Sequence, residues 1–219
     1  MPVADTSLAI RGQGIHKQFF DKPSGRTIRA LDDVSIEIPP GTLTAFVGPD
    51  GAGKTTLLRL LASSLSPSEG EILWRGVPLP RRLAEFRGDM LYLGHQPGIK
   101  SALTPRENLR WLESLQAPGR DRVAGALVAV GLAGLEDVPC HTLSAGQQRR
   151  VALARLRLSR AALWILDEPF TAIDRDGVAA LETLIVDHAR QGGVAVLTTH
   201  QALGLEGVRL LALEPYGRA

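Results

Sequence analysis

Apolar runs alternate with segments of helical periodicity along most of this chain. Short apolar runs bounded by turn residues predict buried strands, whereas apolar residues repeated every three or four positions predict helices with one buried face. Strands are expected at 43–47, 163–166 and 194–198, and helices at about 55–64, 147–159 and 178–190. Strands and helices in alternation are typical of a mainly parallel sheet covered by helices. The pattern therefore predicts an α/β protein.

The beginning of the chain has a different pattern. Residues 31–38 alternate apolar and polar positions until a Pro-Pro-Gly sequence at 39–41 breaks the strand. Residues 21–25 are rich in turn formers and predict a loop between two strands. Further strands are expected at 71–74 and 90–94. This region favours a small antiparallel sheet that lies against the parallel one.

Residues 97–142 return to a helical pattern, with loop signals at 117–119 and 138–139. We expect this segment to form a helical subdomain. It would be inserted between residues 1–96 and residues 143–219, which together would form the parallel core and the antiparallel sheet of a single domain.

Composition narrows the class of protein. The chain has 219 residues, of which 44% are hydrophobic, so it can build a sizeable core. The net charge of +2 is small, and we expect no nucleic-acid partner. Cys140 is the single cysteine, which excludes an intrachain disulfide and favours a reducing compartment. No run approaches the ~18 apolar residues of a membrane span, and the N-terminus lacks the pattern of a secretory signal.

A glycine-rich segment between the strand at 43–47 and the following helix predicts a phosphate site. Its sequence fits the spacing G-x-x-x-x-G-K-[ST], in which glycines let backbone N–H groups curve around phosphate oxygens. The helix that begins there directs its positive dipole at the same anion. Lys54 would add charge near the β- and γ-phosphates, and the Thr55 hydroxyl can ligate Mg²⁺. The expected contacts are Gly48, Pro49, Asp50, Gly51, Ala52, Gly53, Lys54, Thr55 and Thr56.

Two acids follow the apolar strand at 163–166. A parallel strand presents its carboxyl end to the ligand crevice of an open α/β sheet, so this position suits catalytic groups. Asp167 is expected to hold Mg²⁺, directly or through water. Glu168 is expected to orient or deprotonate the attacking water.

Between these two sites, residues 143–150 read Leu-Ser-Ala-Gly-Gln-Gln-Arg-Arg, which resembles the LSGGQ signature of ATP-binding-cassette (ABC) ATPases. Such a segment opens a helix and is a second surface for anions. The resemblance implies the ABC ATPase form of the P-loop NTPase fold. It also implies a head-to-tail homodimer, in which Ser144, Ala145, Gly146 and Gln147 of one protomer close over the ATP held by the other.

The resemblance extends to other positions and implies roles for them. Gln96 matches the residue that senses Mg²⁺ and the attacking water, and His200 matches the histidine that contacts the γ-phosphate. Phe19 matches the aromatic residue that stacks on adenine, with Phe20 as the neighbouring alternative. Residues 171–174 resemble the segment that lies at the dimer interface. The implied catalytic set is Lys54, Gln96, Glu168 and His200, and the implied metal ligands are Thr55, Gln96 and Asp167.

Three positions depart from the common ABC pattern. Ala145 stands where many relatives have glycine, which adds a methyl group beside the γ-phosphate. Asp50 replaces the common asparagine and brings an acid close to an anion. Phe19 replaces tyrosine, so the ring is kept and the hydroxyl is lost.

Within the ABC ATPases, segments 93–100, 103–109, 144–156 and 163–174 are similar to the CcmA family, the ATP-binding subunits of cytochrome c maturation, also called heme exporter subunits. This resemblance implies a peripheral protein on the cytoplasmic face of the bacterial inner membrane. Its partners would be an integral membrane subunit of the CcmB type, with CcmC, CcmD and the heme chaperone CcmE nearby. The chain has no C-x-x-C-H heme-attachment sequence of its own.

Other readings stay open at the level of sequence. The chain resembles ATPase subunits of other ABC exporters in the same motifs. Soluble ABC ATPases of DNA repair insert long coiled coils before the signature, and those of translation fuse two cassettes, whereas this chain has neither feature. A P-loop kinase or GTPase would lack the signature.

Overall fold

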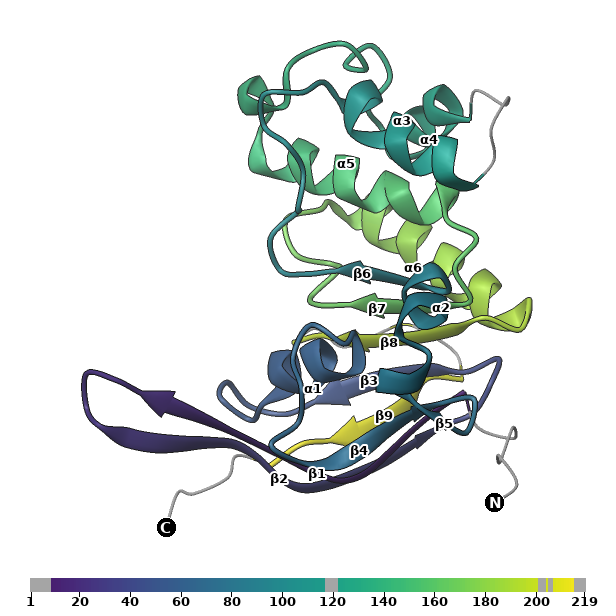
Figure 1. The fold of residues 1–219 in the computed structure, drawn as a ribbon. Coiled ribbons are helices and arrows are strands. Elements are labelled where there is room, and N and C mark those ends of the chain that lie inside the picture. The colour runs from purple at the N-terminus through teal and green to yellow at the C-terminus, as the bar shows by residue number, and fades with distance from the viewer. Residues whose placement is uncertain (1–8, 117–121, 201–203, 205–206, 215–219) are drawn as a thin grey trace.

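The computed structural model describes residues 9–116, 122–200, 204 and 207–214, and arranges them in layers (Figure 1). A parallel sheet lies in the middle, with an antiparallel sheet on one side and a group of helices on the other. The strands are β1 (Ile10–Asp21), β2 (Arg26–Ile38), β3 (Leu43–Val47), β4 (Glu69–Trp74), β5 (Val77–Pro78), β6 (Met90–Leu93), β7 (Leu163–Leu166), β8 (Val194–Thr198) and β9 (Arg209–Ala212). The α-helices are α1 (Lys54–Leu61), α2 (Leu83–Gly88), α3 (Pro105–Gln116), α4 (Val123–Ala129), α5 (Ala145–Leu158) and α6 (Arg175–Arg190).

The parallel sheet positions the functional site. Its strand order is β6-β7-β8-β3-β9, and all four neighbouring pairs are parallel. Leu93 pairs with Leu166, and Leu166 pairs with Leu197, so the strands end close to one another. The segments that follow β3, β6, β7 and β8 therefore leave the sheet at the same edge, where ligands of open α/β sheets bind.

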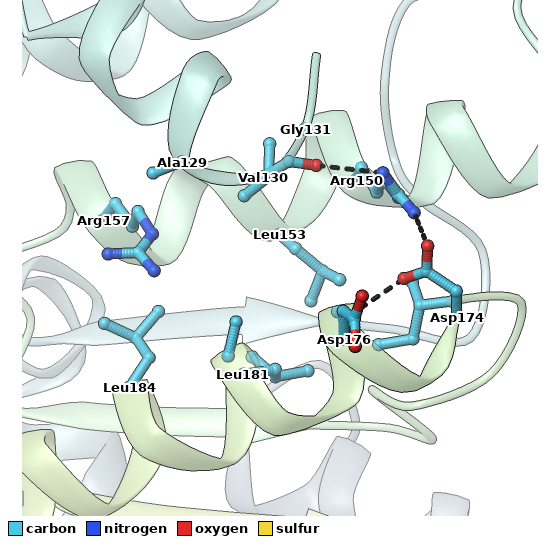
Figure 2. Close-up of a pocket in the computed structure, with 13 residues that line it drawn as sticks. Ala129, Val130, Gly131, Arg150, Leu153, Arg157, Asp174, Asp176, Leu181 and Leu184 are labelled. Atoms are coloured by element: carbon cyan, nitrogen blue, oxygen red, sulfur yellow. Dashed lines mark hydrogen bonds and ion pairs between the residues drawn. The ribbon is translucent and has the colours of Figure 1, made fainter. Parts of the chain in front are cut away.

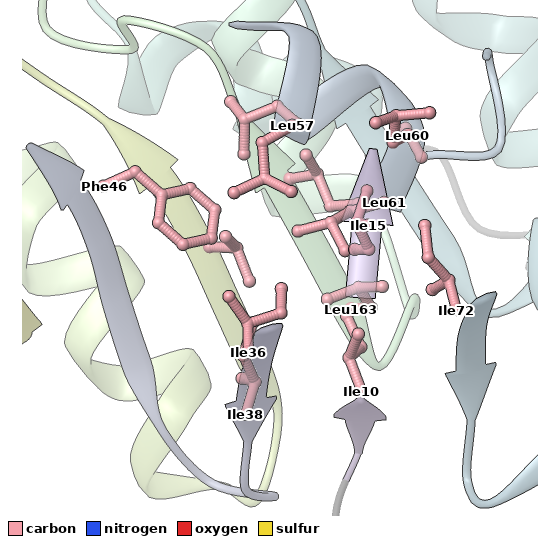
Figure 3. Close-up of a cluster of buried hydrophobic side chains, with 14 of the residues drawn as sticks. Ile10, Ile15, Ile36, Ile38, Phe46, Leu57, Leu60, Leu61, Ile72 and Leu163 are labelled. Atoms are coloured by element: carbon pink, nitrogen blue, oxygen red, sulfur yellow. The ribbon is translucent and has the colours of Figure 1, made fainter. Parts of the chain in front are cut away.

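The antiparallel sheet has the order β2-β1-β4-β5 and closes one side of the core. Figure 3 shows isoleucines of this sheet, such as Ile15 and Ile36, facing Leu57 and Leu61 of α1 and Phe46 of β3. These side chains are all buried. Helix α1 is thus held between the two sheets, and its first residue is fixed relative to both.

Helices α3 and α4 pack against each other and against α5. Leu109 of α3, Leu127 of α4 and Val151 of α5 are completely buried in one cluster. Asn108 fastens the segment before α3, because its side chain accepts from the Lys100 N–H at 2.8 Å and donates to the Lys100 carbonyl at 3.0 Å. The chain between β6 and α3 therefore has a defined path over this layer.

The structure confirms the α/β class, the parallel sheet and the antiparallel sheet. The strands expected at 43–47, 163–166 and 194–198 are present, and the helices begin or end within three residues of the expected bounds. Strand β9 and helix α2 were not predicted. The loop expected at 117–119 lies outside the described residues. In the part of the chain that is described, no helix has the length and apolar character needed to cross a membrane.

Candidate functional site: a phosphate loop, two acids and a helix terminus

The loop after β3 opens helix α1 in the way that a phosphate site requires. Gly53 has φ 88°, and a Cβ atom there would lie 2.6 Å from the Ala30 carbonyl oxygen, so only glycine fits. Among the residues that the structure describes, no side chain caps the helix here. The first N–H groups of α1 are thus available to an anion, because they have no acceptor inside the helix.

Lys54 is folded back onto its own loop. Its ammonium group donates to the carbonyl oxygens of Gly48 at 2.6 Å and Pro49 at 3.0 Å, and the side chain is buried. The positive charge is therefore held against the backbone of the loop itself.

Asp167 is a buried carboxylate at the end of β7, with an exposed fraction of 1%. One oxygen, Oδ1, accepts from the Thr198 hydroxyl at 2.8 Å and from the Thr55 hydroxyl at 3.2 Å. The other oxygen, Oδ2, has no hydrogen-bond partner among the described residues. A buried carboxylate with a free oxygen beside a threonine hydroxyl offers the oxygen ligands that Mg²⁺ prefers. These residues fit the metal, although no group of three or more His, Cys, Asp or Glu suited to a metal occurs in the described chain.

Glu168 has a left-handed backbone, with φ 51°. Its N–H donates to the Thr198 hydroxyl at 3.0 Å, and a residue keeps this unusual conformation only where its surroundings fix it. The His200 Nε2 lies 3.2 Å from a Glu168 carboxylate oxygen and 3.2 Å from an Asp50 carboxylate oxygen. One imidazole nitrogen therefore lies close to both the second acid and the phosphate loop.

A cavity of about 440 Å³ covers this group. It is lined by Ala30, Asp50, Gly51, Ala52, Gly53, Lys54, Thr55, Thr56, His95, Glu168, Thr171 and His200. The phosphate loop, Glu168 and His200 were expected there from the sequence. His95 and Thr171 were not.

Five of the residues expected around the nucleotide lie outside this lining, namely Phe19, Gly48, Pro49, Gln96 and Asp167. Gln96 is exposed and follows His95 at the end of β6. Phe19 is 39% exposed on β1, and the Lys17 ammonium lies 5.3 Å from its ring centroid. Phe20 is 66% exposed. Neither aromatic ring is a core residue, so both are open to a ligand or a partner.

The signature segment opens helix α5 with a complete capping box. The Ser144 hydroxyl accepts from the Gln147 N–H at 3.2 Å, and the Gln147 side chain accepts from the Ser144 N–H at 2.9 Å. Ser144 and Ala145 are exposed and Gly146 is half-buried. A Cβ atom on Gly146 would lie 2.8 Å from the Ala172 carbonyl oxygen, which explains the glycine. The helix terminus is thus rigid and open to solvent.

Two adjacent arginines on α5 reach in different directions. Arg149 donates to carbonyl oxygens at the ends of β6 and β7. Arg150 donates to the Asp174 carboxylate at 2.6 Å and to the Val130 carbonyl at 3.5 Å (Figure 2). Arg150 lies beside a cavity of about 260 Å³ between α4, α5 and α6. Its partner Asp174 also caps α6 by accepting from the Gly177 N–H at 3.0 Å, and both contacts lower the pKa of Asp174.

Besides His95 and Thr171, sequence reasoning missed Thr198 and Arg149. Both hold the two acids through hydrogen bonds, and each contributes at least one bond to a backbone atom. Thr198 is the last residue of β8, next to β7, so strand order could have indicated it once the sheet was known. For Arg149, the signal was a charged residue on the buried face of the helix after the signature.

The matching family model is that of the ABC transporter, over residues 31–171. The chain is 53% identical over 180 residues to the cytochrome c biogenesis ATP-binding export protein CcmA of Pseudomonas fluorescens, covering 81% of this chain and 85% of that one. It is 55% identical over 175 residues to CcmA of Yersinia pestis, covering 80% of each chain.

Solved structures agree on the fold. The dimeric ATP-binding cassette MJ0796 has a TM-score of 0.82 and 24% identity over 94% of each chain. A putative ABC transporter ATP-binding protein from Pyrococcus furiosus has a TM-score of 0.76 and 26% identity, covering 93% of this chain and 96% of that one. The chain therefore belongs to the ABC transporter family of ATP-binding proteins and, within it, to the CcmA family of cytochrome c biogenesis ATP-binding export proteins.

Proposed function

We propose that this ABC-type ATPase supplies energy to a membrane complex of c-type cytochrome biogenesis, through heme export or the release of a heme-loaded chaperone. The observation that carries the proposal is the identity of 53% over most of the chain to proteins named for this process. The site supports it with a phosphate loop, two acids and a signature helix in one molecule.

The phosphate loop supports nucleotide binding. The triphosphate would lie along residues 48–56, held by backbone N–H groups, the α1 dipole and the Lys54 ammonium. Adenine would stack on Phe19 or Phe20, both of which are exposed. Thr55 and Asp167 would hold Mg²⁺, with Gln96 as a third ligand. The metal, when bound, neutralises charge on the β- and γ-phosphates.

Hydrolysis would use Glu168 and His200. The Glu168 carboxylate orients the attacking water and takes its proton. His200 lies 3.2 Å from that carboxylate and would contact the γ-phosphate. Glu168, which has a left-handed backbone, lines the same cavity as the phosphate loop and His200. The positions of these groups would be fixed before ATP arrives.

The second half of each site would come from a twin. In a head-to-tail homodimer, Ser144, Ala145, Gly146 and Gln147 of one protomer would close over the γ-phosphate bound by the other. The exposure of Ser144 and Ala145 supports this arrangement, since a buried helix terminus could not meet another molecule. Dimers are described for the cassette MJ0796, including a post-hydrolysis state with ADP and Pi.

The catalytic proposal is tested with Glu168→Gln, which keeps the shape of the side chain and removes the base. We expect normal ATP binding, loss of turnover and a trapped ATP-bound dimer, measured by ATPase assay and size-exclusion chromatography with ATP. Normal turnover in this variant would refute the assignment of Glu168 as the base.

The membrane partner would dock on the segment between β6 and α3. We infer an integral membrane subunit of the CcmB type, with CcmC, CcmD and CcmE nearby, at the cytoplasmic face of the inner membrane. Asn108 holds this segment in a fixed path, and Ile99 and Ser101 lie on it with half-buried and exposed side chains.

Cross-linking tests this docking site. Single cysteines at Ile99 and Ser101, in a Cys140→Ala background, should cross-link to a membrane subunit in intact membranes. A cysteine at Ser24, in the exposed turn between β1 and β2, is the matched control and should not. Absence of cross-links at both test positions would contradict the proposed surface.

A further inference from the structure

Arg149 is a buried arginine whose hydrogen bonds all go to backbone carbonyl oxygens. It lies on α5 with an exposed fraction of 4%. One terminal nitrogen donates to the carbonyls of Gly94 at 2.8 Å and His95 at 3.3 Å. The other donates to the carbonyls of Asp167 at 3.2 Å and Glu168 at 2.8 Å. A single side chain thus joins α5 to the segments after β6 and after β7.

This arrangement is costly for stability. A buried charge loses its hydration, and Arg149 Nε has no hydrogen-bond partner among the described residues. Burial lowers the pKa of Arg149, and the charges of Asp167 and Glu168 oppose that effect. An apolar side chain could fill this position without the desolvation cost. The arginine is therefore better explained by what its fork-shaped group holds in place.

What it holds is the backbone of the proposed catalytic base. Glu168 has φ 51°, a conformation that costs a non-glycine residue free energy and persists only when its surroundings fix it. The Thr198 hydroxyl fixes the N–H of Glu168, and Arg149 fixes its carbonyl. Removing either contact would let the peptide relax and change the direction of the carboxylate.

We propose that Arg149 is a positioning residue for ATP hydrolysis, which holds Glu168 and the segment at Gly94 and His95 in register with the signature helix. The inference rests on the proposed role of Glu168. In the proposed dimer, the signature end of α5 serves the nucleotide of the twin, while Arg149 on the same helix sets the base of its own protomer. The side chain acts through the backbone and does not touch the nucleotide.

The test compares Arg149→Lys with Arg157→Lys in the full-length chain. Lysine keeps the charge of Arg149 but cannot bridge two pairs of carbonyls. Arg157 lies on the same helix and lines the cavity between α4 and α6, so its variant controls for loss of an α5 arginine. We expect kcat to fall about 10- to 100-fold in Arg149→Lys, because a small misplacement of a catalytic group has effects of this order. ATP affinity, from titration with a fluorescent analogue, should stay within about twofold, since Arg149 makes no contact with the phosphate loop.

Arg149→Gln is the second variant, because it removes the buried charge and retains an amide donor. In this variant, too, kcat should fall while ATP affinity stays close to that of the wild type. Wild-type turnover in both Arg149 variants would overturn the proposal. Loss of ATP binding in both variants would overturn it as well, because it would indicate a general structural role. If the Glu168→Gln variant hydrolyses ATP at the normal rate, the assignment of Glu168 as the base is wrong. That result is distinguishable from any result obtained with the Arg149 variants.

Discussion

A Thr→Val substitution can be compared at two buried positions, Thr198, whose hydroxyl is hydrogen-bonded, and Thr44, whose hydroxyl has no partner among the described residues. Both are threonines on adjacent parallel strands, β8 and β3, with exposed fractions of 1% and 0%. The Thr198 hydroxyl donates to Asp167 at 2.8 Å and accepts from the Glu168 N–H at 3.0 Å. The Thr44 hydroxyl has no hydrogen-bond partner in the described part of the chain. Valine has nearly the same shape as threonine and lacks the hydroxyl.

The magnitudes follow from the two sets of contacts. Thr198→Val removes a hydrogen bond to a charged group, worth ~1.5–3 kcal/mol, and leaves a buried N–H unsatisfied, which costs ~1–3 kcal/mol. The two losses share one hydroxyl and are not fully additive, so we expect the free energy of unfolding to fall by ~2–4 kcal/mol. Thr44→Val removes a buried hydroxyl that has no partner among the described residues, and should leave the free energy of unfolding unchanged or raise it by up to ~1 kcal/mol.

Urea unfolding followed by circular dichroism measures both changes. Thr198→Ser keeps the hydroxyl and should recover most of the loss. ATP turnover should also fall in Thr198→Val, because the direction of the Glu168 carboxylate depends on the bonded N–H. If Thr198→Val and Thr44→Val change the free energy of unfolding by the same amount, the hydroxyl does not hold the two acids and the reasoning fails.

Two further predictions concern Lys54 and His188. Lys54→Ala removes the ammonium group from the phosphate loop, so ATP affinity should fall at least ~10-fold in a fluorescence titration; affinity within twofold of wild type would contradict the proposed phosphate site. His188 stacks on Trp164 with ring centroids 3.8 Å apart, and burial lowers its pKa in the folded state. The unfolded chain therefore binds this proton more readily, and the free energy of unfolding should decline as pH falls below ~6.5, the ordinary pKa of histidine. His188→Phe keeps a stacked ring and should reduce that decline in urea unfolding at several pH values, whereas an unchanged slope would exclude His188 as its source.

The strands of the parallel sheet were predictable because burial on both faces produces uninterrupted apolar runs. Strand β7 is buried at all four positions and β8 at all five. Strand β9 is different, because it lies at the edge of the sheet and is mostly exposed. Leu210, Leu211 and Ala212, with the following Leu213, do form an apolar run, so the sequence carried a signal for this strand that was not used. Helix α2 has six residues, too few for a periodic signal.

The residues of the candidate site also divide into those that the sequence predicted and those that it did not. Lys54, Asp167 and Glu168 stand in contiguous motifs, so their spacing predicted them. Thr198 and Arg149 stand outside these two motifs and, apart from the bond between Thr198 and the Asp167 carboxylate, they bond to backbone atoms. No pattern of side chains announces a hydrogen bond to a backbone N–H or carbonyl. Such residues become visible only when strand order and helix packing are known.

Helix α5 connects the two acids with the 171–174 segment and with the end of α4. Arg149 and Arg150 are adjacent, and successive residues on a helix point about 100° apart, so the two side chains contact different neighbours. Arg149 bonds to carbonyls after β6 and β7, and Arg150 bonds to Asp174 and to Val130 at the end of α4. An intact helix cannot move at one of these positions and stay fixed at the next. A displacement of α5 must therefore move the backbone at the two acids and the 171–174 segment together. Because α5 shares a buried cluster with α3 and α4, the same displacement would also involve these two helices.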